Sequence, residues 1–378
     1  MRSRARIVLT GFLVGGFFGL LHLILTFSVP SYSPSSLLSS VYPPALHYTR
    51  PDHAPLSTLP RANATFVVLC RNSDLAGIMS SVQQMEDRFN KRYGYPWVFL
   101  NDEPFTEEFK TRLSTLTDAH VSFGTIPKEH WVQPDWIDEE RAAQQRKSMS
   151  TDMLHFIPYA GSVSYRNMCR FNSGFFFQHE LLQPYRYYWR VEPDVRYFCD
   201  LDYDPFAFME SNGKTYGFTV ALEEYRWTIL SLWDTVKEFM KESPHLLPDN
   251  NLMSFISDDW GNTYNYCHFW SNFEIADMDF WRGEAYTKFF NFLDQKGGFY
   301  YERWGDAPVH SIAASLFLRK DEIHFFGDIG YRHDPFQMCP QGDVWTRGRC
   351  SCNPKETMDV GVKSCMAKYT KANLTDAE

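Results

Sequence analysis

The sequence predicts an α/β protein built on a mixed, mostly parallel sheet flanked by helices. Apolar runs of strand length alternate with segments whose apolar residues recur at helical spacing, and short loops join them. Strands separated by a helix usually pair in parallel, and the helices then cover both faces of the sheet. The 318 residues from Arg61 onward are long for one domain, but compact α/β enzymes reach that size.

The elements follow in order along this region. A continuous apolar run at Thr65–Cys70 predicts a buried strand, and Asn72 and Ser73 are suited to cap the next element. Apolar residues from Leu75 to Phe89 then keep helical spacing until Gly94 breaks the pattern. The alternation continues with strand Tyr95–Leu100, helix Thr106–Leu113, strand His120–Ile126, helix Trp136–Leu154, helix Tyr165–His179 and a strand that begins at Tyr187.

The run YYWRVEPDVRYFCDLDYD, Tyr187–Asp204, is the most informative stretch. It places Glu192 and Asp194 on either side of Pro193, and alternate residues of a strand point to the same side, so both acids can face one ligand. Proline cannot donate to a sheet ladder, so the strand should end there, where α/β proteins usually bind ligands.

Carboxylates in that position suit a hard divalent cation, which commonly carries a diphosphate. The pattern is therefore the one expected of a nucleotide-sugar transferase. For an isolated E-P-D triplet, a solvated turn with two surface acids is the simpler interpretation.

The N-terminal residues predict a membrane anchor. Three arginines in a cytosolic tail, residues 1–6, precede an uncharged run over residues 7–29 that would span roughly 34 Å as a helix. A cleaved signal peptide usually has a shorter apolar region. The arginines should stay in the cytosol, which makes the chain a single-pass type II membrane protein whose remainder is luminal.

A Pro/Ser-rich luminal stem is expected over residues 30–60, where seven prolines and seven serines fall in 31 residues. An arm packed along the following domain is the alternative for its later half. Residues 61–378 are then one luminal catalytic domain. Its eight cysteines favour disulfides in an oxidising compartment, and four of them crowd a Cys-rich C-terminal tail.

Net charge and short motifs limit the classes of partner and metal that this protein can bind. The net charge is −9, and no basic tract follows the first six residues, which argues against nucleic acid. Asn63-Ala-Thr65 and Asn373-Leu-Thr375 are glycosylation sequons, which suits a luminal domain. No C-x-x-C pair or histidine cluster indicates zinc.

Five blocks resemble the fungal Golgi α-1,2-mannosyltransferase family, glycosyltransferase family 15. They are RNMCRFNSGFF, YYWRVEPDV, YNYCHFWSNFEIA, WGDAPVHSIAASLFL and HFFGDIGYRHDPF, and they occur in the family's order between about Arg61 and Pro340. The resemblance implies a GT-A type, Rossmann-like fold after one transmembrane helix. It also implies a Golgi location and retaining transfer of mannose from GDP-mannose, with Mn²⁺, to a mannose-terminated N- or O-linked glycan.

The resemblance assigns the metal to Glu192 and to His333 in GYRHDP. Imidazole suits Mn²⁺ better than Mg²⁺, and a bound cation would act as a Lewis acid on the leaving diphosphate. Without the family blocks, His333 would be a surface loop histidine. Asp200, Asp202 and Asp204 form a rival D-x-D-x-D, which is otherwise a solvated turn before Pro205.

Glu274, in SNFEIA, matches the family's carboxylate near the anomeric carbon. Retention needs either a covalent intermediate, for which the carboxylate is the nucleophile, or a same-face attack that the carboxylate supports electrostatically. Both routes stay open, as does a structural acid hydrogen-bonded in an aromatic pocket. Burial there would favour the protonated acid unless the group is paired.

The other matches cover donor and acceptor sites. Asp306 matches an acid of the acceptor pocket, although Asp before Ala-Pro also suits a helix N-cap. Tyr165 matches a catalytic position. Arg190 could clamp a phosphate bidentately, Arg71 could do likewise in the nucleotide pocket, and Asp194 could orient the loop or touch the ribose.

Three functions fit these features. The first is a retaining α-1,2-mannosyltransferase, the second a mannosylphosphate transferase of the same family, and the third an inert glycan-binding or scaffolding member. The acids and histidine assigned above count against the third. A glycoside hydrolase is more remote, because hydrolysis needs no diphosphate-binding metal. Association into homo- or hetero-oligomers stays open.

Overall fold

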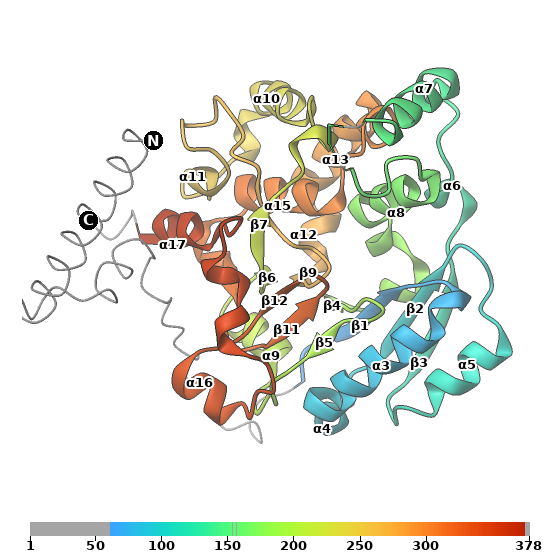
Figure 1. Cartoon of the computed structure of the whole chain (residues 1–378), viewed down its shortest axis with the longest axis vertical. Helices are drawn as coiled ribbons and strands as arrows, with labels where there is room; N and C mark the ends of the chain where they lie inside the picture. The colour runs from blue at the N-terminus through green and yellow to red at the C-terminus, as the bar shows by residue number, and fades with distance from the viewer. Residues whose placement is uncertain (1–60, 153, 156, 375–378) are drawn as a thin grey trace, which may run out of the picture. The chain divides into compact units, whose positions relative to one another are not determined.

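The computed structural model describes residues 61–152, 154–155 and 157–374 (Figure 1). The predicted cytosolic tail (1–6), membrane span (7–29) and stem (30–60) lie outside these residues. Within the described part of the chain, no helix has the length and apolar character needed to cross a membrane.

A seven-stranded sheet forms the centre of this region, in the order β10-β6-β9-β4-β1-β2-β3. All neighbours pair in parallel except β9, which runs antiparallel to both β4 and β6. The prediction of a mixed, mostly parallel sheet is therefore confirmed. The strands are β1 (Ala64–Leu69), β2 (Trp97–Asn101), β3 (Val121–Thr125), β4 (Tyr187–Arg190), β6 (Tyr216–Phe218), β9 (Ile275–Asp277) and β10 (Ile323–Phe325).

The remaining strands form two smaller sheets. One is antiparallel with the order β12-β11-β5, from β5 (Arg196–Tyr197), β11 (Tyr331–His333) and β12 (Phe336–Met338). The other pairs β7 (Ala221–Glu223) with β8 (Cys267–Phe269).

Helices cover both faces of the large sheet (Figure 1). Phe66 and Val68 of β1 belong to the same apolar cluster as Ile78 and Phe109, whereas Val67 faces a pocket lined by α8. The helices are α3 (Leu75–Met85), α4 (Lys91–Tyr93), α5 (Glu107–Ser114), α6 (Lys128–Trp131), α7 (Glu139–Ser150), α8 (Val163–Gly174), α9 (Pro205–Ser211), α10 (Leu232–Glu242), α11 (Met253–Ile256), α12 (Met278–Arg282), α13 (Glu284–Lys296), α14 (Gly298–Tyr301), α15 (Asp306–Phe317), α16 (Gly342–Arg347) and α17 (Met366–Leu374).

The predicted elements of the first half are present, with ends that move by a few residues. The helix expected up to Gly94 is three pieces: α3, a π-helical stretch at Glu86–Asn90, and α4. Gly94 ends it with φ 65°, in the left-handed region that glycine adopts freely. Glu86 is buried in this stretch because Trp97 and Asn90 both donate to its carboxylate at 2.7 Å.

The predicted caps after the first strand are wrong. Asn72 instead ties two loops together: its Nδ2 donates to the Pro104 carbonyl at 3.1 Å, and its Oδ1 accepts from the Thr106 backbone at 3.0 Å. Ser73 donates to Asp74, not to the helix backbone. Asn72 therefore makes long-range hydrogen bonds in place of the cap that the local sequence predicted.

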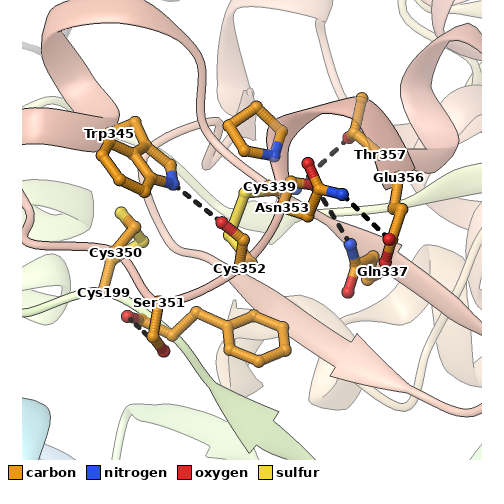
Figure 2. The surroundings of a disulfide bond; sticks show 12 residues. Cys199, Gln337, Cys339, Trp345, Cys350, Ser351, Cys352, Asn353, Glu356 and Thr357 are labelled. Atoms are coloured by element: carbon orange, nitrogen blue, oxygen red, sulfur yellow. Dashed lines mark hydrogen bonds between the residues drawn. A yellow bond between two sulfur atoms is a disulfide. The ribbon is translucent and has the colours of Figure 1, made fainter.

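Three disulfides hold the C-terminal region: Cys199–Cys350, Cys339–Cys352 and Cys267–Cys365. The first two lie side by side and adjoin the ends of β5 and β12, with Trp345 Nε1 donating to the Cys352 carbonyl at 2.9 Å (Figure 2). The Cys-rich tail therefore clamps the small sheet that carries His333.

Thiol titration tests this pairing. Cys70 and Cys169 are free and buried, and burial raises the pKa of both thiols. The thiols of the native protein should react slowly with a thiol reagent. In the denatured, non-reduced protein, two thiols per chain should react. A titre of eight would show that the cysteines are unpaired and would contradict the oxidising-compartment argument.

Candidate active site

Arg190, the last residue of β4, is the centre of the site. Its guanidinium donates to Glu192 Oε1 from Nε at 2.9 Å and from Nη2 at 2.5 Å, and Nη1 donates to Asp306 Oδ2 at 2.5 Å. Burial alone would lower the pKa of Arg190, but the charges of Glu192, Asp306 and Glu274 raise it well above its ordinary value. The predicted phosphate clamp would compete with these contacts, because protein acceptors already engage most of the guanidinium.

Glu192 and His333 come together although 141 positions separate them. Strand β5 follows the E-P-D turn and pairs with β11, which ends at His333, so the small sheet carries the histidine to the turn. His333 Nε2 lies 3.8 Å from Glu192 Oε2, the oxygen that Arg190 leaves free. The two side chains are 32% and 24% exposed, so a ligand from solvent can reach them.

The tautomer of His333 suits metal binding. Its Nδ1 lies 3.2 Å from the backbone carbonyl of Asp334, and a carbonyl can only accept, so Nδ1 carries the hydrogen. In the neutral ring, the lone pair is then on Nε2, the nitrogen that lies on the side of Glu192. A second-shell carbonyl that fixes the ring in this way is typical of histidine ligands to metals.

Asp194 does not join this pair. The strand ends before Pro193, as predicted, and Asp194 has φ 61°, so the chain turns away. Its carboxylate lies against helix α3, where a Cβ on Gly77 would come within 2.6 Å of Asp194 Oδ2. The expectation that both acids of E-P-D face one ligand is therefore wrong, because the strand geometry that it assumed stops at Arg190.

Glu274 lies just before β9 and is only 1% exposed. Tyr188 donates to its Oε1 at 2.7 Å, Tyr216 donates to Oε2 at 3.1 Å, and His310 Nδ1 lies 3.1 Å from Oε2. Burial is the main cause that raises the pKa of both tyrosines well above the ordinary value, and the charge of Glu274 is the next. The phenols therefore keep their protons.

The Glu274 backbone carbonyl also accepts from the Arg190 amide at 2.9 Å, which joins the two parts of the site. A pocket between the sheet and α8 connects them further. Its walls are Val67, Leu69, Leu100, Phe171, Asn172, Phe176, Tyr188, Arg190 and Glu274.

Asp306 is the first residue of α15 and not its N-cap, a position that Gly305 takes. Its Oδ2 accepts from Arg190 and, at 2.7 Å, from Ser271. Burial would raise the pKa of Asp306, but Arg190 and then His310 hold it below its usual value. The N-cap alternative is thus wrong, and the charge of Arg190 supplies the reason for a buried aspartate here.

Tyr165 and Arg71 lie close to each other at the start of α8. Tyr165 stacks on Tyr159 with ring centroids 4.5 Å apart, and the guanidinium of Arg303 lies 5.1 Å from its ring centroid. Burial raises the pKa of Tyr165 well above its usual value. Arg71 Nη2 donates to Ser164 at 2.8 Å, so the arginine that follows β1 adjoins the tyrosine.

The rival D-x-D-x-D motif has structural partners at both ends. Asp200 pairs with Arg88 at 2.5 Å and with Arg349. Asp204 Oδ1 caps α9 and its Oδ2 accepts from Tyr95 at 2.6 Å. These contacts favour Glu192 over this motif as the site acid.

Sequence reasoning missed three partners of Glu274, namely Tyr188, Tyr216 and His310. One available signal concerned His310, which lies four residues after Asp306 and so on the same face of any helix that starts there. The two tyrosines had no local signal, because they reach Glu274 across strands β4, β6 and β9.

Comparisons with known proteins agree with this architecture. The family described as glycolipid 2-alpha-mannosyltransferase matches residues 46–374. The chain is 50% identical to alpha-1,2 mannosyltransferase KTR1 of Saccharomyces cerevisiae over 92% of this chain and 87% of that protein. It is 51% identical to O-glycoside alpha-1,2-mannosyltransferase omh1 of Schizosaccharomyces pombe, over 82% of this chain and 79% of that one.

Two solved structures are also similar. Core-mannan synthase A of Aspergillus fumigatus, in a Mn/GDP form, has a TM-score of 0.78 and 42% identity, covering 85% of this chain and 87% of that one. The S. cerevisiae mannosyltransferase Ktr4p in complex with GDP has a TM-score of 0.79 and 44% identity, covering 82% of each chain. The chain therefore belongs to the glycolipid 2-alpha-mannosyltransferase family, glycosyltransferase family 15.

Proposed function

We propose that this protein is a retaining α-1,2-mannosyltransferase that moves mannose from GDP-mannose to a mannose-terminated glycan. The observation that carries the proposal is that one arginine contacts both the Glu192–His333 pair, where we place a metal ion, and the buried Glu274. Arg190 binds Glu192 through its side chain and the Glu274 carbonyl through its amide. A glycosyl donor with a diphosphate leaving group needs a cation at one end and stabilising charge at the other.

Glu192 Oε2 and His333 Nε2 fit Mn²⁺ as the cation. A carboxylate oxygen and an imidazole nitrogen suit this ion, and their separation of 3.8 Å lies within the roughly 4 Å that two ligands, each about 2.1 Å from one small ion, can span. No cluster of three or more His, Cys, Asp or Glu side chains suited to a metal occurs among the described residues. We therefore expect diphosphate oxygens and water to complete the coordination, and the bound ion to stabilise the leaving diphosphate.

Glu274 is suited to an electrostatic role. Two tyrosine hydroxyls and His310 already surround its oxygens, and the side chain is almost fully buried. A nucleophile needs a free, accessible lone pair, whereas a carboxylate held by fixed donors can stabilise positive charge on the sugar without moving. This arrangement supports a same-face attack by the acceptor.

On the acceptor side we assign Asp306 and Tyr165. Arg190 and Ser271 both bind Asp306 Oδ2, so we expect a sugar hydroxyl to meet Oδ1. Tyr165, on α8, keeps its phenolic proton because burial raises its pKa. Its ring lies under the guanidinium of Arg303, three residues before Asp306, so we expect its hydroxyl to donate to the sugar. Arg71 and Asp194 are proposed contacts of the nucleotide.

Product analysis tests the whole proposal. The purified full-length protein, given GDP-mannose, Mn²⁺ and methyl α-mannoside, should release GDP and form an α-1,2-linked disaccharide that nuclear magnetic resonance identifies. A phosphate-containing product would establish the mannosylphosphate transferase instead. Transfer of mannosylphosphate leaves GMP, so only the absence of both GDP and GMP release would favour a non-catalytic glycan-binding protein. A β-linked product would overturn retention.

The metal assignment makes a direct prediction. Glu192→Ala or His333→Ala should lower Mn²⁺-dependent transfer by at least about two orders of magnitude, because each removes a direct ligand and loss of second-shell partners alone costs 10- to 100-fold. Asp202→Asn, in the rival motif, is the matched control and should retain activity. Thermal unfolding should show that the variants fold. Near-normal activity of Glu192→Ala at low Mn²⁺, or of the native enzyme in chelator, contradicts the assignment.

The role of Glu274 is tested by Glu274→Gln, which keeps the size of the side chain and one accepting oxygen but removes the charge. The maximal rate should fall by about two to three orders of magnitude, equivalent to several kcal/mol. The Michaelis constant for GDP-mannose should change little, because the cation and diphosphate contacts lie elsewhere. Weakened donor binding at an unchanged maximal rate would make Glu274 a binding residue.

We also propose a Golgi location, with residues 7–29 in the membrane and the catalytic domain luminal. In intact Golgi vesicles, added protease should spare the domain, and an endoglycosidase should shift the mobility of the native chain. Asn63→Gln, which removes the sequon at an exposed asparagine, should reduce this shift. Digestion of the domain in sealed vesicles would show the opposite orientation.

A further inference from the structure

His310 is a buried titratable group that no step above uses. It lies on α15, one turn after Asp306, and is 0% exposed. Its ring stacks on Trp281 with centroids 4.2 Å apart, which fixes the plane of the imidazole. Its two nitrogens each meet one oxygen: Nδ1 meets Glu274 Oε2 at 3.1 Å, and Nε2 meets the Asn172 carbonyl at 3.1 Å.

The partners restrict where protons can be. A backbone carbonyl only accepts, so Nε2 carries a hydrogen. The contact between Nδ1 and the carboxylate then needs one more proton, either on the imidazole or on the carboxyl. A neutral histidine beside an ionised carboxylate would leave two lone pairs facing each other at 3.1 Å in a buried site.

The other donors favour the charged form of Glu274. Trp281 Nε1 donates to the Tyr188 hydroxyl at 3.2 Å, so that hydroxyl is free to donate its own proton to Glu274. Tyr216 donates to Oε2 as well. A carboxyl group that accepts several hydrogen bonds is stabilised as the anion.

The surrounding charges can accommodate an imidazolium. Asp306, on the same helix, faces His310 with a negative charge, and Arg190 on β4 faces Glu274 with a positive one. The remaining titratable neighbours are the phenols of Tyr188, Tyr216 and Tyr286, whose rings or hydroxyls border the pair. These phenols stay neutral, because burial raises the pKa of each well above its usual value.

We propose that His310 is a positioning residue that holds the proton of this pair and thereby keeps Glu274 ionised and fixed for mannosyl transfer. The inference rests on the proposed function, since it gives Glu274 a charge for that reaction to use. Without His310, the carboxyl would lose a charged hydrogen-bond partner in a site that is almost fully buried. Burial would then favour the protonated, neutral acid.

Kinetics against pH provide the first test, on the purified full-length enzyme. His310→Phe keeps an aromatic ring beside Trp281 but removes both nitrogens, and it should move the acid limb of the kcat profile to higher pH. If Glu274 in this variant is half-protonated at a pH one to two units above that of the assay, kcat near neutral pH should fall about 10- to 100-fold. It should recover at higher pH, where Glu274 is ionised. The Michaelis constant for GDP-mannose should stay nearly constant.

Two variants separate this effect from a general loss of packing. His310→Asn places a neutral amide donor near Nδ1, so its limb should lie between those of the native enzyme and His310→Phe. His179→Asn is the matched control, because His179 is also buried and its ring nitrogens hydrogen-bond to backbone groups of Thr125 and Leu181. Its acid limb should coincide with that of the native enzyme.

Infrared spectroscopy tests the pair without relying on turnover. The carbonyl stretch of a protonated carboxylic acid should be absent for Glu274 in the native enzyme near neutral pH, appear in His310→Phe, and vanish again when Glu274→Gln is added. An equal loss of kcat at every pH, or a protonated Glu274 band in the native enzyme, would overturn the inference. If the native enzyme transfers no mannose, the proposed function fails, and the infrared result still decides the pair.

Discussion

The buried guanidinium of Arg190 is the interaction on which the site depends. A charge removed from water is stable only if it is paired and hydrogen-bonded, and Arg190 meets this condition with Glu192 and Asp306 at 2.5 Å each. The two acids come from different segments, the E-P-D turn after β4 and the start of α15. The guanidinium of Arg190 thus fixes the acid of the proposed metal site and the acid of the proposed acceptor site at a defined separation.

The sheet topology explains why these groups meet at β4. Strand β4 pairs in parallel with β1 and antiparallel with β9, so its carboxyl end adjoins the residues that lead into β9. Glu274 precedes β9 and therefore lies beside Arg190, whose amide donates to its carbonyl. Two disulfides hold the small β12-β11-β5 sheet (Figure 2). This sheet brings His333 to the side chain of Glu192. The large sheet thus places Glu274, and the small cross-linked sheet places His333.

Local pattern was sufficient for some of this and not for the rest. The buried strands β1 and β2 have continuous apolar runs, so periodicity and length identify them. The end of β4 follows from Pro193, but the direction of Asp194 does not, because it depends on a left-handed turn and on the space above Gly77. The contacts of Tyr188 with Glu274, Arg190 with Asp306 and Glu192 with His333 span 86, 116 and 141 positions. Only the family blocks indicated that Glu274, Asp306 and His333 belong to one site.

The central claim is that a cation between Glu192 and His333 holds the diphosphate of the donor at the end of β4. Anomalous scattering from manganese in crystals grown with Mn²⁺ and GDP tests it most directly. The account predicts one strong peak within coordination distance of Glu192 Oε2 and His333 Nε2, in contact with the diphosphate. A peak at Asp200, Asp202 or Asp204, or diphosphate bound away from β4, would contradict it.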